Sequence, residues 1–232
     1  MKNSKITGQT PQIHNRTTTG TTAMPQKKGS HSSPFGSVAA VVLAAGGARR
    51  YGEAKQLLNW NGQPFVHVIA NTALEAGLSP VIVVTGAWHS EVSQAVANLP
   101  VEIIHNPHWQ KGQSTSVKAG LRALPPQCGA SIFLLADQPH IPSELLRSLV
   151  ETHQKTNAPL IAPQVNGQLT NPVLFDKVTF PDFETITGDQ GGRALFKRYP
   201  PLLIRWPEAI PNLDVDTPDD YQILLRHNDN GE

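Results

Sequence analysis

The run Val38-Ala39-Ala40-Val41-Val42-Leu43-Ala44 is apolar throughout and does not alternate with polar residues. A strand with this pattern is covered on both faces, as strands are in a parallel sheet between two layers of helices. It is followed at once by Ala45-Gly46-Gly47-Ala48-Arg49-Arg50-Tyr51-Gly52-Glu53-Ala54-Lys55, a segment that contains three glycines and ends in a lysine. Residues 38–55 therefore predict a buried strand that leads into a glycine-rich loop.

Four further apolar runs follow along the chain, at residues 80–85, 101–105, 131–136 and 160–162. The segments between them carry apolar residues at helical spacing and predict helices at 64–76, 88–99, 114–124 and 142–153. Beyond residue 162 we predict a helix at 190–199, a strand at 202–204 and a last helix from 217 or 218 to about 226. Alternating strands and helices predict one three-layer α/β/α domain with a mostly parallel sheet.

The first 37 residues differ in composition from the rest of the chain. They hold five basic side chains and no acidic ones, whereas residues 38–232 hold 14 basic and 18 acidic side chains. Ser, Thr and Gly dominate this segment, which has too few large apolar residues to offset its conformational entropy. We therefore predict a disordered basic tail over 1–37 and a single domain over 38–228. The tail is either inert, with Met24 as an alternative start, or a targeting or partner-binding arm.

Composition excludes several classes of protein. The 232 residues hold 19 basic and 18 acidic side chains, a balance that argues against a protein that coats nucleic acid. No run of about 18 apolar residues offers a membrane span. The single cysteine, Cys128, which we expect in a loop, rules out a disulfide framework and a multi-cysteine zinc site. These features together predict a soluble, cytoplasmic protein.

The glycine-rich segment has the composition of a phosphate-binding loop. Glycines let backbone N–H groups approach phosphate oxygens at the carboxyl end of a strand, and Arg49 and Lys55 supply positive charge. The spacing of Gly47 and Gly52 fits a Walker A motif, but Glu53-Ala54 stands where Lys-Ser/Thr is needed. The Rossmann G-x-G-x-x-G is absent as well, which argues against a dinucleotide cofactor. A tight turn with exposed charges is the alternative interpretation.

Acidic side chains follow other predicted elements. Asp137 ends a buried strand, so its carboxylate would enter the same crevice as the glycine loop and could bind Mg²⁺ together with substrate phosphates. Its alternative role is to cap the next turn. Asp214 and Asp216 share one face of an extended segment, where one of them could be a second metal ligand. Asp189 belongs to a glycine-rich segment that is either a helix start or another phosphate or metal contact.

Five motifs occur along the chain in this order: LAAGGARRYGEAKQLL at 43–58, NPHWQKGQSTSVKAGL at 106–121, LLADQP at 134–139, GDQGGRAL at 188–195 and DVDTP at 214–218. In this order they resemble the MobA-like nucleotidyltransferases, and most of all their molybdenum cofactor cytidylyltransferase branch. The resemblance implies a Rossmann-like α/β nucleotidyltransferase fold with one reversed strand. It also implies an Mg²⁺-dependent enzyme that transfers a nucleoside monophosphate to an acceptor phosphate and releases pyrophosphate.

The resemblance assigns roles to particular residues. The catalytic residues would be Arg49, on the outgoing β and γ phosphates, Lys55, near the α-phosphate, and Asp137, the main Mg²⁺ ligand. Asp216 would be the second metal ligand, with Asp214 or Asp189 as alternatives. The nucleotide would be bound by Leu43, Ala44, Ala45, Gly46, Gly47, Lys55, Gly112 and Ser116.

The resemblance also implies substrates and partners. Ala45-Gly46 is typical of the cytidylyl branch and favours CTP over GTP, and the implied acceptor is molybdopterin. A molybdoenzyme or its maturation chaperone would be the protein partner, with no nucleic acid and no membrane. Thr170-Asn171-Pro172 departs from the sequence usual at that place, so a sugar phosphate acceptor stays open. The hypotheses from other classes are a non-catalytic nucleotide- or pterin-cofactor-binding module and an NAD(P)-dependent oxidoreductase.

Overall fold

The computed structural model describes residues 36–47, 53–207, 215 and 217–229 of the chain, all within one compact unit, Ser32–Glu232. The predicted tail therefore lies almost entirely outside the described residues, and the boundaries predicted for the tail and the domain stay a prediction. Arg49, Asp214 and Asp216, three of the proposed site residues, also lie outside the described residues.

Strands and helices alternate along the described part of the chain. The strands are β1 (Ser37–Ala44), β2 (Asn59–Trp60), β3 (Gln63–Pro64), β4 (Val81–Thr85), β5 (Glu102–His105), β6 (Cys128–Leu135), β7 (Leu160–Val165), β8 (Gln168–Leu169), β9 (Val173–Asp176) and β10 (Leu202–Arg205). The α-helices are α1 (Phe65–Glu75), α2 (His89–Ala95), α3 (Gln113–Ala123), α4 (Ser143–Thr156) and α5 (Pro218–Asp229). Short 3₁₀ helices are η1 (Lys55–Leu57), η2 (Trp109–Lys111), η3 (Lys177–Thr185) and η4 (Gly192–Leu195). No helix in this part of the chain is long and apolar enough to cross a membrane.

The main sheet has the strand order β10-β7-β9-β6-β1-β4-β5, and β8 pairs with β7 at its side. β1 pairs in parallel with both β4 and β6, whereas β9 runs antiparallel to its neighbours β6 and β7. The predicted mostly parallel sheet is confirmed, and β9 is the reversed strand within this order, while the two-residue β8 also runs antiparallel to β7. The register places Leu43 of β1 opposite Leu135 of β6, so both strands reach the same edge of the sheet together.

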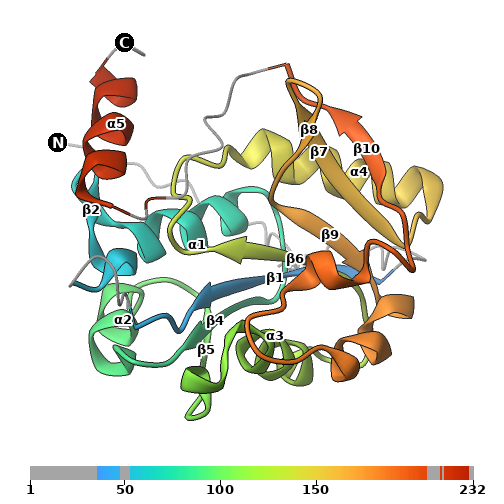
Figure 1. The fold of residues 1–232 in the computed structure, drawn as a ribbon, viewed down its shortest axis with the longest axis horizontal. Coiled ribbons are helices and arrows are strands. Elements are labelled where there is room, and N and C mark those ends of the chain that lie inside the picture. Colours follow the sequence, from blue (N-terminus) through green and yellow to red (C-terminus); the bar gives the residue numbers. More distant parts are fainter. Residues whose placement is uncertain (1–35, 48–52, 208–214, 216, 230–232) are drawn as a thin grey trace, which may run out of the picture. The chain divides into compact units, whose positions relative to one another are not determined.

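Helices cover both faces of this sheet, as the continuous apolar run of β1 predicts (Figure 1). Val42 lies in the core cluster formed with α1, α2 and α4, and Val41 lies in the cluster formed with α3 and η3. Both valines are fully buried, because successive side chains of a strand point to opposite faces. Packing on both faces fixes the position of β1. The start of the loop that follows β1 is therefore fixed as well.

The last helix begins at the predicted capping pair and packs on a small cluster of its own. The backbone N–H of Thr217 donates to Asp220 Oδ2 at 2.8 Å, and the N–H of Asp220 donates to Thr217 Oγ1 at 3.3 Å. This reciprocal pair satisfies N–H groups that the first turn leaves without partners. Leu224 of α5 then packs against Phe65 at the start of α1.

The helix predicted at 190–199 is wrong in extent, because only the short 3₁₀ helix η4 forms there. Close packing decides this conformation. A Cβ atom on Gly192 would lie 2.3 Å from the ring of Phe175, and one on Gly191 would lie 2.8 Å from Gln113 Oε1. The two glycines therefore bring the backbone against the sheet and α3, and this contact outweighs the helical spacing of the segment.

Cys128 begins the buried strand β6 and does not lie in a loop, so that expectation is also wrong. Its side chain is 2% exposed, and its thiol donates to the carbonyl oxygen of Ala130 at 3.0 Å. Burial disfavours the thiolate and raises the pKa of Cys128 above the ordinary value for a cysteine. We expect iodoacetamide to alkylate the folded protein much more slowly than the protein in denaturant at pH 8.

The raised pKa of Cys128 also predicts how stability depends on pH. Above about pH 9 the unfolded chain loses the thiol proton while the folded chain keeps it, so the unfolded state binds fewer protons. The free energy of unfolding should then fall by up to about 1.4 kcal/mol per pH unit from this group, until the folded pKa is reached. Urea titrations of wild type and Cys128→Ala between pH 8 and pH 10 measure the part of the pH dependence that is due to Cys128. An equal alkaline loss in both proteins would contradict the prediction.

Candidate functional site

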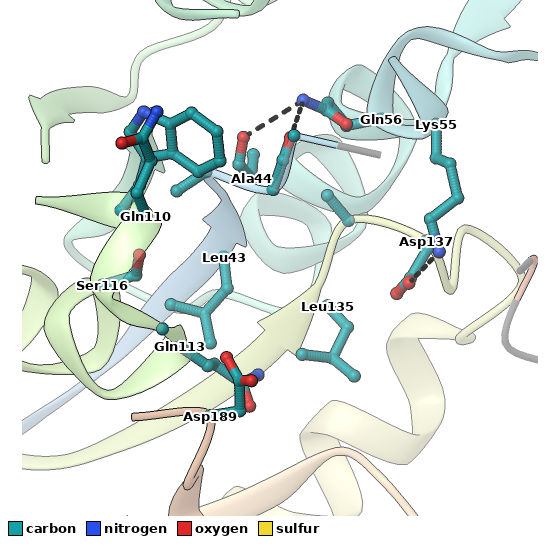
Figure 2. Close-up of a pocket in the computed structure, with 16 residues that line it drawn as sticks. Leu43, Ala44, Lys55, Gln56, Gln110, Gln113, Ser116, Leu135, Asp137 and Asp189 are labelled. Carbon is teal, nitrogen blue, oxygen red and sulfur yellow. Dashed lines mark hydrogen bonds and ion pairs between the residues drawn. The ribbon is translucent and has the colours of Figure 1, made fainter. Parts of the chain in front are cut away.

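A cavity of about 520 Å³ opens where β1 and β6 end side by side. In open α/β sheets ligands bind in the crevice at the carboxyl ends of such strands. The lining residues come from the loop after β1, from η1, from η2 with the start of α3, from the end of β6 and from the glycine-rich segment around residue 189: Leu43, Ala44, Ala45, Gly46, Gly47, Lys55, Gln56, Trp109, Gln110, Gly112, Gln113, Ser116, Leu135, Ala136, Asp137 and Asp189. Figure 2 draws these residues around the cavity.

Lys55 and Asp137 form an ion pair at the wall of this cavity. The Lys55 Nζ atom lies 3.2 Å from Asp137 Oδ2, and the two side chains are 16% and 26% exposed. Asp137 reaches this place because β6 ends at Leu135, and Lys55 reaches it because η1 begins directly after the loop of β1. In such a cavity the cation can neutralise negative charge on a polyphosphate. The carboxylate can bind a divalent metal that contacts the same phosphates.

Gln56 fixes the loop after β1 through two hydrogen bonds. Its side chain is 5% exposed, and its Nε2 donates to the carbonyl oxygen of Gly46 at 3.1 Å and to that of Ala44 at 3.4 Å (Figure 2). A buried amide that satisfies two carbonyls fixes the orientation of the peptide groups in the loop. Those two carbonyl oxygens are therefore paired with Gln56.

A second hydrogen-bond network organises the start of α3. The buried side chain of Asn106 donates from Nδ2 to Ser116 Oγ at 2.9 Å and to Thr115 Oγ1 at 2.8 Å, and its Oδ1 accepts from the N–H of His108 at 3.0 Å. Because Ser116 Oγ accepts from Asn106, its own O–H can donate to a group in the cavity.

Two tight contacts fix the walls of the cavity. A Cβ atom on Gly47 would lie 2.7 Å from the indole ring of Trp109, so this ring packs directly on the glycine loop. A Cβ atom on Gly112, whose φ is +106°, would lie 2.2 Å from the carbonyl carbon of Gly188. The N–H of Ser114 donates to the carbonyl oxygen of Gly188 at 3.0 Å. The segment around Asp189 is thereby held against the start of α3.

All predicted site residues within the described ranges line this one cavity: Leu43, Ala44, Ala45, Gly46, Gly47, Lys55, Gly112, Ser116 and Asp137. Sequence reasoning missed Gln56 and gave no individual role to Trp109, although both lie inside the motifs quoted for the site. The sequence signal for Gln56 is that it directly follows Lys55 in the motif at 43–58. Asp189 lines the cavity too, but Figure 2 shows it apart from the Lys55–Asp137 pair.

The donor set of the cavity fits a divalent metal that keeps water and phosphate ligands. Among the described residues no three His, Cys, Asp or Glu side chains cluster to hold a metal, as an all-protein site would require. Mg²⁺ is usually bound by only one or two carboxylates together with substrate phosphates. Asp137 supplies one partly exposed carboxylate at the wall, which meets that requirement.

Solved structures identify the fold. Rv0371c from Mycobacterium tuberculosis superposes with a TM-score of 0.74 at 26% identity, over 83% of this chain and 99% of that chain. Its homologue from Mycobacterium sp. strain JC1 superposes with a TM-score of 0.75 at 29% identity, over 84% and 98%. A further structure of Rv0371c is a complex with manganese, with a TM-score of 0.71 at 26% identity, over 82% and 98%. A nucleotidyl transferase from Methanothermobacter thermautotroptrophicus superposes with a TM-score of 0.72 at 20% identity, over 84% and 99%, so the mixed sheet with its reversed strand is that of the α/β nucleotidyltransferase fold.

The family follows from the sequence match. Residues 40–202 match the MobA-like NTP transferase domain, so the chain belongs to this family and is a nucleotidyltransferase. The predicted resemblance is confirmed at the level of the family.

Curated relatives cover nearly the same part of the chain. The purine catabolism protein PucB of Bacillus subtilis (strain 168) is 30% identical over 203 residues, 80% of this chain and 95% of PucB. Nicotine blue oxidoreductase of Paenarthrobacter nicotinovorans is 31% identical over 199 residues, 81% and 96%. The molybdenum cofactor cytidylyltransferase of Escherichia coli (strain K12) is 29% identical over 185 residues, 78% and 92%.

Proposed function

We propose that this protein transfers CMP from CTP to a phosphorylated acceptor, molybdopterin, and releases pyrophosphate with Mg²⁺. The observation that carries the proposal is the Lys55–Asp137 ion pair, 3.2 Å apart, beside the glycine loop in one cavity. The relative named molybdenum cofactor cytidylyltransferase supports the donor and the acceptor. We also propose a cytoplasmic location and a molybdoenzyme or its maturation chaperone as the protein partner.

In this proposal the loop and its neighbours bind the triphosphate. The backbone of Ala44, Ala45, Gly46 and Gly47 approaches the nucleotide, and Gln56 pairs with the carbonyls of Ala44 and Gly46 so that their orientation is fixed. Lys55 neutralises charge at the α-phosphate. The resemblance adds Arg49 on the outgoing phosphates and Asp216 as a second metal ligand.

The reaction needs positioning and charge stabilisation more than covalent help. A phosphate oxygen of the acceptor attacks the α-phosphorus of CTP, the new P–O bond forms, and the bond to the β-phosphate oxygen breaks to release pyrophosphate. The acceptor phosphate is already a nucleophile, so no general base is required. A bound Mg²⁺ would neutralise negative charge on the phosphates, and Asp137 would hold it.

The choice of CTP is supported by Ala45-Gly46, whereas Ser116 can bind the carbonyl of a base without distinguishing CTP from GTP. The Ser116 hydroxyl faces the cavity with its proton free to donate, because Asn106 donates to its oxygen at 2.9 Å. The oxygen of cytosine can accept such a hydrogen bond, and guanine offers a carbonyl as well, so GTP is the second candidate donor.

A screen of purified protein tests the proposal. CTP, GTP, ATP and UTP are incubated with molybdopterin or with a sugar phosphate, with Mg²⁺, with Mn²⁺ or with EDTA, and pyrophosphate is measured. We expect release from CTP with molybdopterin that EDTA abolishes. Release only from GTP would overturn the choice of base, and release only with the sugar phosphate would overturn the acceptor. Tight nucleotide binding without release, or consumption of NADH or NADPH, would overturn the transfer reaction.

We expect Gln56→Met to weaken nucleotide binding without unfolding the protein. The methionine fills similar space but cannot donate to the carbonyls of Ala44 and Gly46, which then turn toward the phosphates. Loss of these bonds should raise the Kd for CTP about tenfold, as measured by calorimetry. Gln56→Glu should raise it further, because a carboxylate repels both carbonyl oxygens.

The matched control for this prediction is Gln154→Met on the exposed surface of α4, which removes an amide far from the cavity. An unchanged Kd in Gln56→Met would show that the loop keeps its orientation without the amide.

A further inference from the structure

Two aromatic side chains outside the cavity join the chain segments that carry the Lys55–Asp137 ion pair. Trp60 of β2 lies shortly after Lys55 in the sequence, and His140 lies shortly after Asp137. Both rings are half-buried, and they stack with 6.1 Å between centroids and 25° between planes, within the usual range for aromatic pairs. The two segments therefore contact each other at the ion pair and again at this stack.

Trp60 has a rigid support. The ring of Phe65 is fully buried and lies edge-on to Trp60 at 6.4 Å between centroids. The hydroxyl of Tyr221 in α5 donates to the carbonyl oxygen of Asn59 at 2.6 Å, so the last helix holds the strand that carries Trp60 (Figure 1). None of these residues lines the nucleotide cavity. The position of the Trp60 ring is therefore set by packing that a bound nucleotide does not touch.

The path from His140 back to Asp137 is short and stiff. Only Gln138 and Pro139 lie between them, and both are buried. The N–H of Gln138 donates to the carbonyl oxygen of Leu135 at 3.1 Å, and the ring of Pro139 fixes its φ. A shift of the His140 ring would therefore move the carboxylate of Asp137, because the segment between them has little freedom to absorb it.

The ion pair alone does not maintain its own geometry in the proposed reaction. Asp137 would then hold a divalent metal and Lys55 would contact a phosphate, so the two side chains attract each other less. The stack of Trp60 on His140 keeps its partners, because neither ring lines the cavity and substrate does not compete for them. It is thus the contact that can hold the two segments in place when substrate is bound.

We infer that Trp60 and His140 are positioning residues, whose stack sets the place of Asp137 relative to Lys55. The inference rests on the proposed function for the roles of Lys55 and Asp137. A misplacement of about 1 Å can lower a rate about 10²-fold. Loss of the stack should therefore lower kcat and metal affinity, whereas the KM for CTP should change little, because Gln56 holds the glycine loop separately.

Variants that remove or keep a ring test this inference. His140→Ala and Trp60→Leu remove the stack, whereas His140→Phe and Trp60→Phe keep two aromatic rings. In the first two we expect kcat for pyrophosphate release to fall about tenfold and the KM for CTP to stay within about twofold of wild type. The last two should resemble wild type. The double variant His140→Ala/Trp60→Leu should lose no more than the weaker of the two single variants, because both changes remove the same contact.

Binding of Mn²⁺ gives a readout that does not need turnover. Mn²⁺ is titrated onto the full-length protein with CTP and without acceptor, and bound Mn²⁺ is measured from the relaxation of water protons. GTP replaces CTP if the screen of donors selects it. We expect the Kd for Mn²⁺ to rise about tenfold in His140→Ala and to stay unchanged in His140→Phe.

The matched control is His105→Ala, which removes one ring from another stacked pair. His105 stacks on His89 at 4.5 Å between centroids, and neither residue lines the cavity. This variant should keep the kcat and the Kd for Mn²⁺ of wild type. Circular dichroism checks that each variant is folded. Trp60→Leu, which keeps an apolar side chain beside Phe65, serves if His140→Ala does not fold.

Three results would overturn the inference: a wild-type kcat and Kd for Mn²⁺ in His140→Ala, additive losses in the double variant, or a loss in His140→Phe as large as in His140→Ala. A lower melting temperature with unchanged kcat would show that the stack only stabilises the fold, which overturns the inference too. Wild-type protein that releases no pyrophosphate overturns the proposed function instead, and the Mn²⁺ titration then still tests whether the stack positions Asp137.

Discussion

The Asp137→Asn variant should lose nearly all pyrophosphate release while it stays folded. The amide keeps the shape of the carboxylate but removes the charge that would hold a divalent metal against the phosphates. Loss of one well-placed electrostatic group lowers kcat by about 10² to 10³. The ion pair with Lys55 is partly exposed and contributes about 1 kcal/mol or less to stability, so the melting temperature should fall by at most about 4 °C.

The control for Asp137→Asn is Glu184→Gln, which also neutralises one carboxylate. Glu184 forms an exposed ion pair with Arg122 and lies outside the cavity, so its loss should leave turnover unchanged. Titration with Mn²⁺ gives a second readout, because a lost metal ligand should raise the metal concentration needed for half-maximal activity. Turnover within a few-fold of wild type in Asp137→Asn would contradict a metal role for this residue.

The Gly112→Ala variant should lose stability and the shape of the cavity together. Gly112 has φ of +106° and ψ of 171°, a backbone conformation that essentially only glycine adopts. The added methyl group would also lie 2.2 Å from the carbonyl carbon of Gly188, so two backbone segments must separate. Strain and overpacking together should lower the free energy of unfolding by about 3 kcal/mol, measured by urea titration.

Gly77→Ala separates the two causes of this loss. Gly77 also has a positive φ, +80°, but a Cβ there would meet no atom within 4 Å. Its replacement should cost about 1 kcal/mol, from backbone strain alone. Equal losses in the two variants would show that the contact between Gly112 and Gly188 contributes nothing. In Gly112→Ala we also expect weaker CTP binding, because residues 188 and 189 move away from α3.

Local patterns predicted most of the fold correctly. The strands at 38–44, 80–85 and 101–105 form within one residue of their expected bounds. β1 and β4 are continuous apolar runs buried between two layers of helices, whereas β5 is an edge strand of the sheet and has no buried residue. The strand that begins at Cys128 starts three residues earlier than expected. Its first residues pair with β1, a long-range contact that a local pattern does not contain.

Two hairpins were missed although the sequence signals them. Asn61-Gly62 joins β2 to β3 and Asn166-Gly167 joins β7 to β8, and all four residues have φ between 52° and 81°. Asn-Gly is the pair that tight two-residue hairpin turns favour, because both turn positions need a positive φ. The Asn-Gly dipeptide at these two places is therefore a sequence signal for both turns.

For the candidate site, local sequence patterns already indicate which residues come to the edge of the sheet. Glycines after β1 and an aspartate after β6 must meet there, because parallel neighbouring strands end at a common edge. The contacts that complete the site come from the three-dimensional packing, which brings Gln56 to the carbonyl of Gly46 and Asp189 to the cavity wall. The backbones of Gly112 and Gly188 pack directly against each other. Such close packing between segments far apart in the sequence depends on the whole fold, so the local spacing of residues does not predict it.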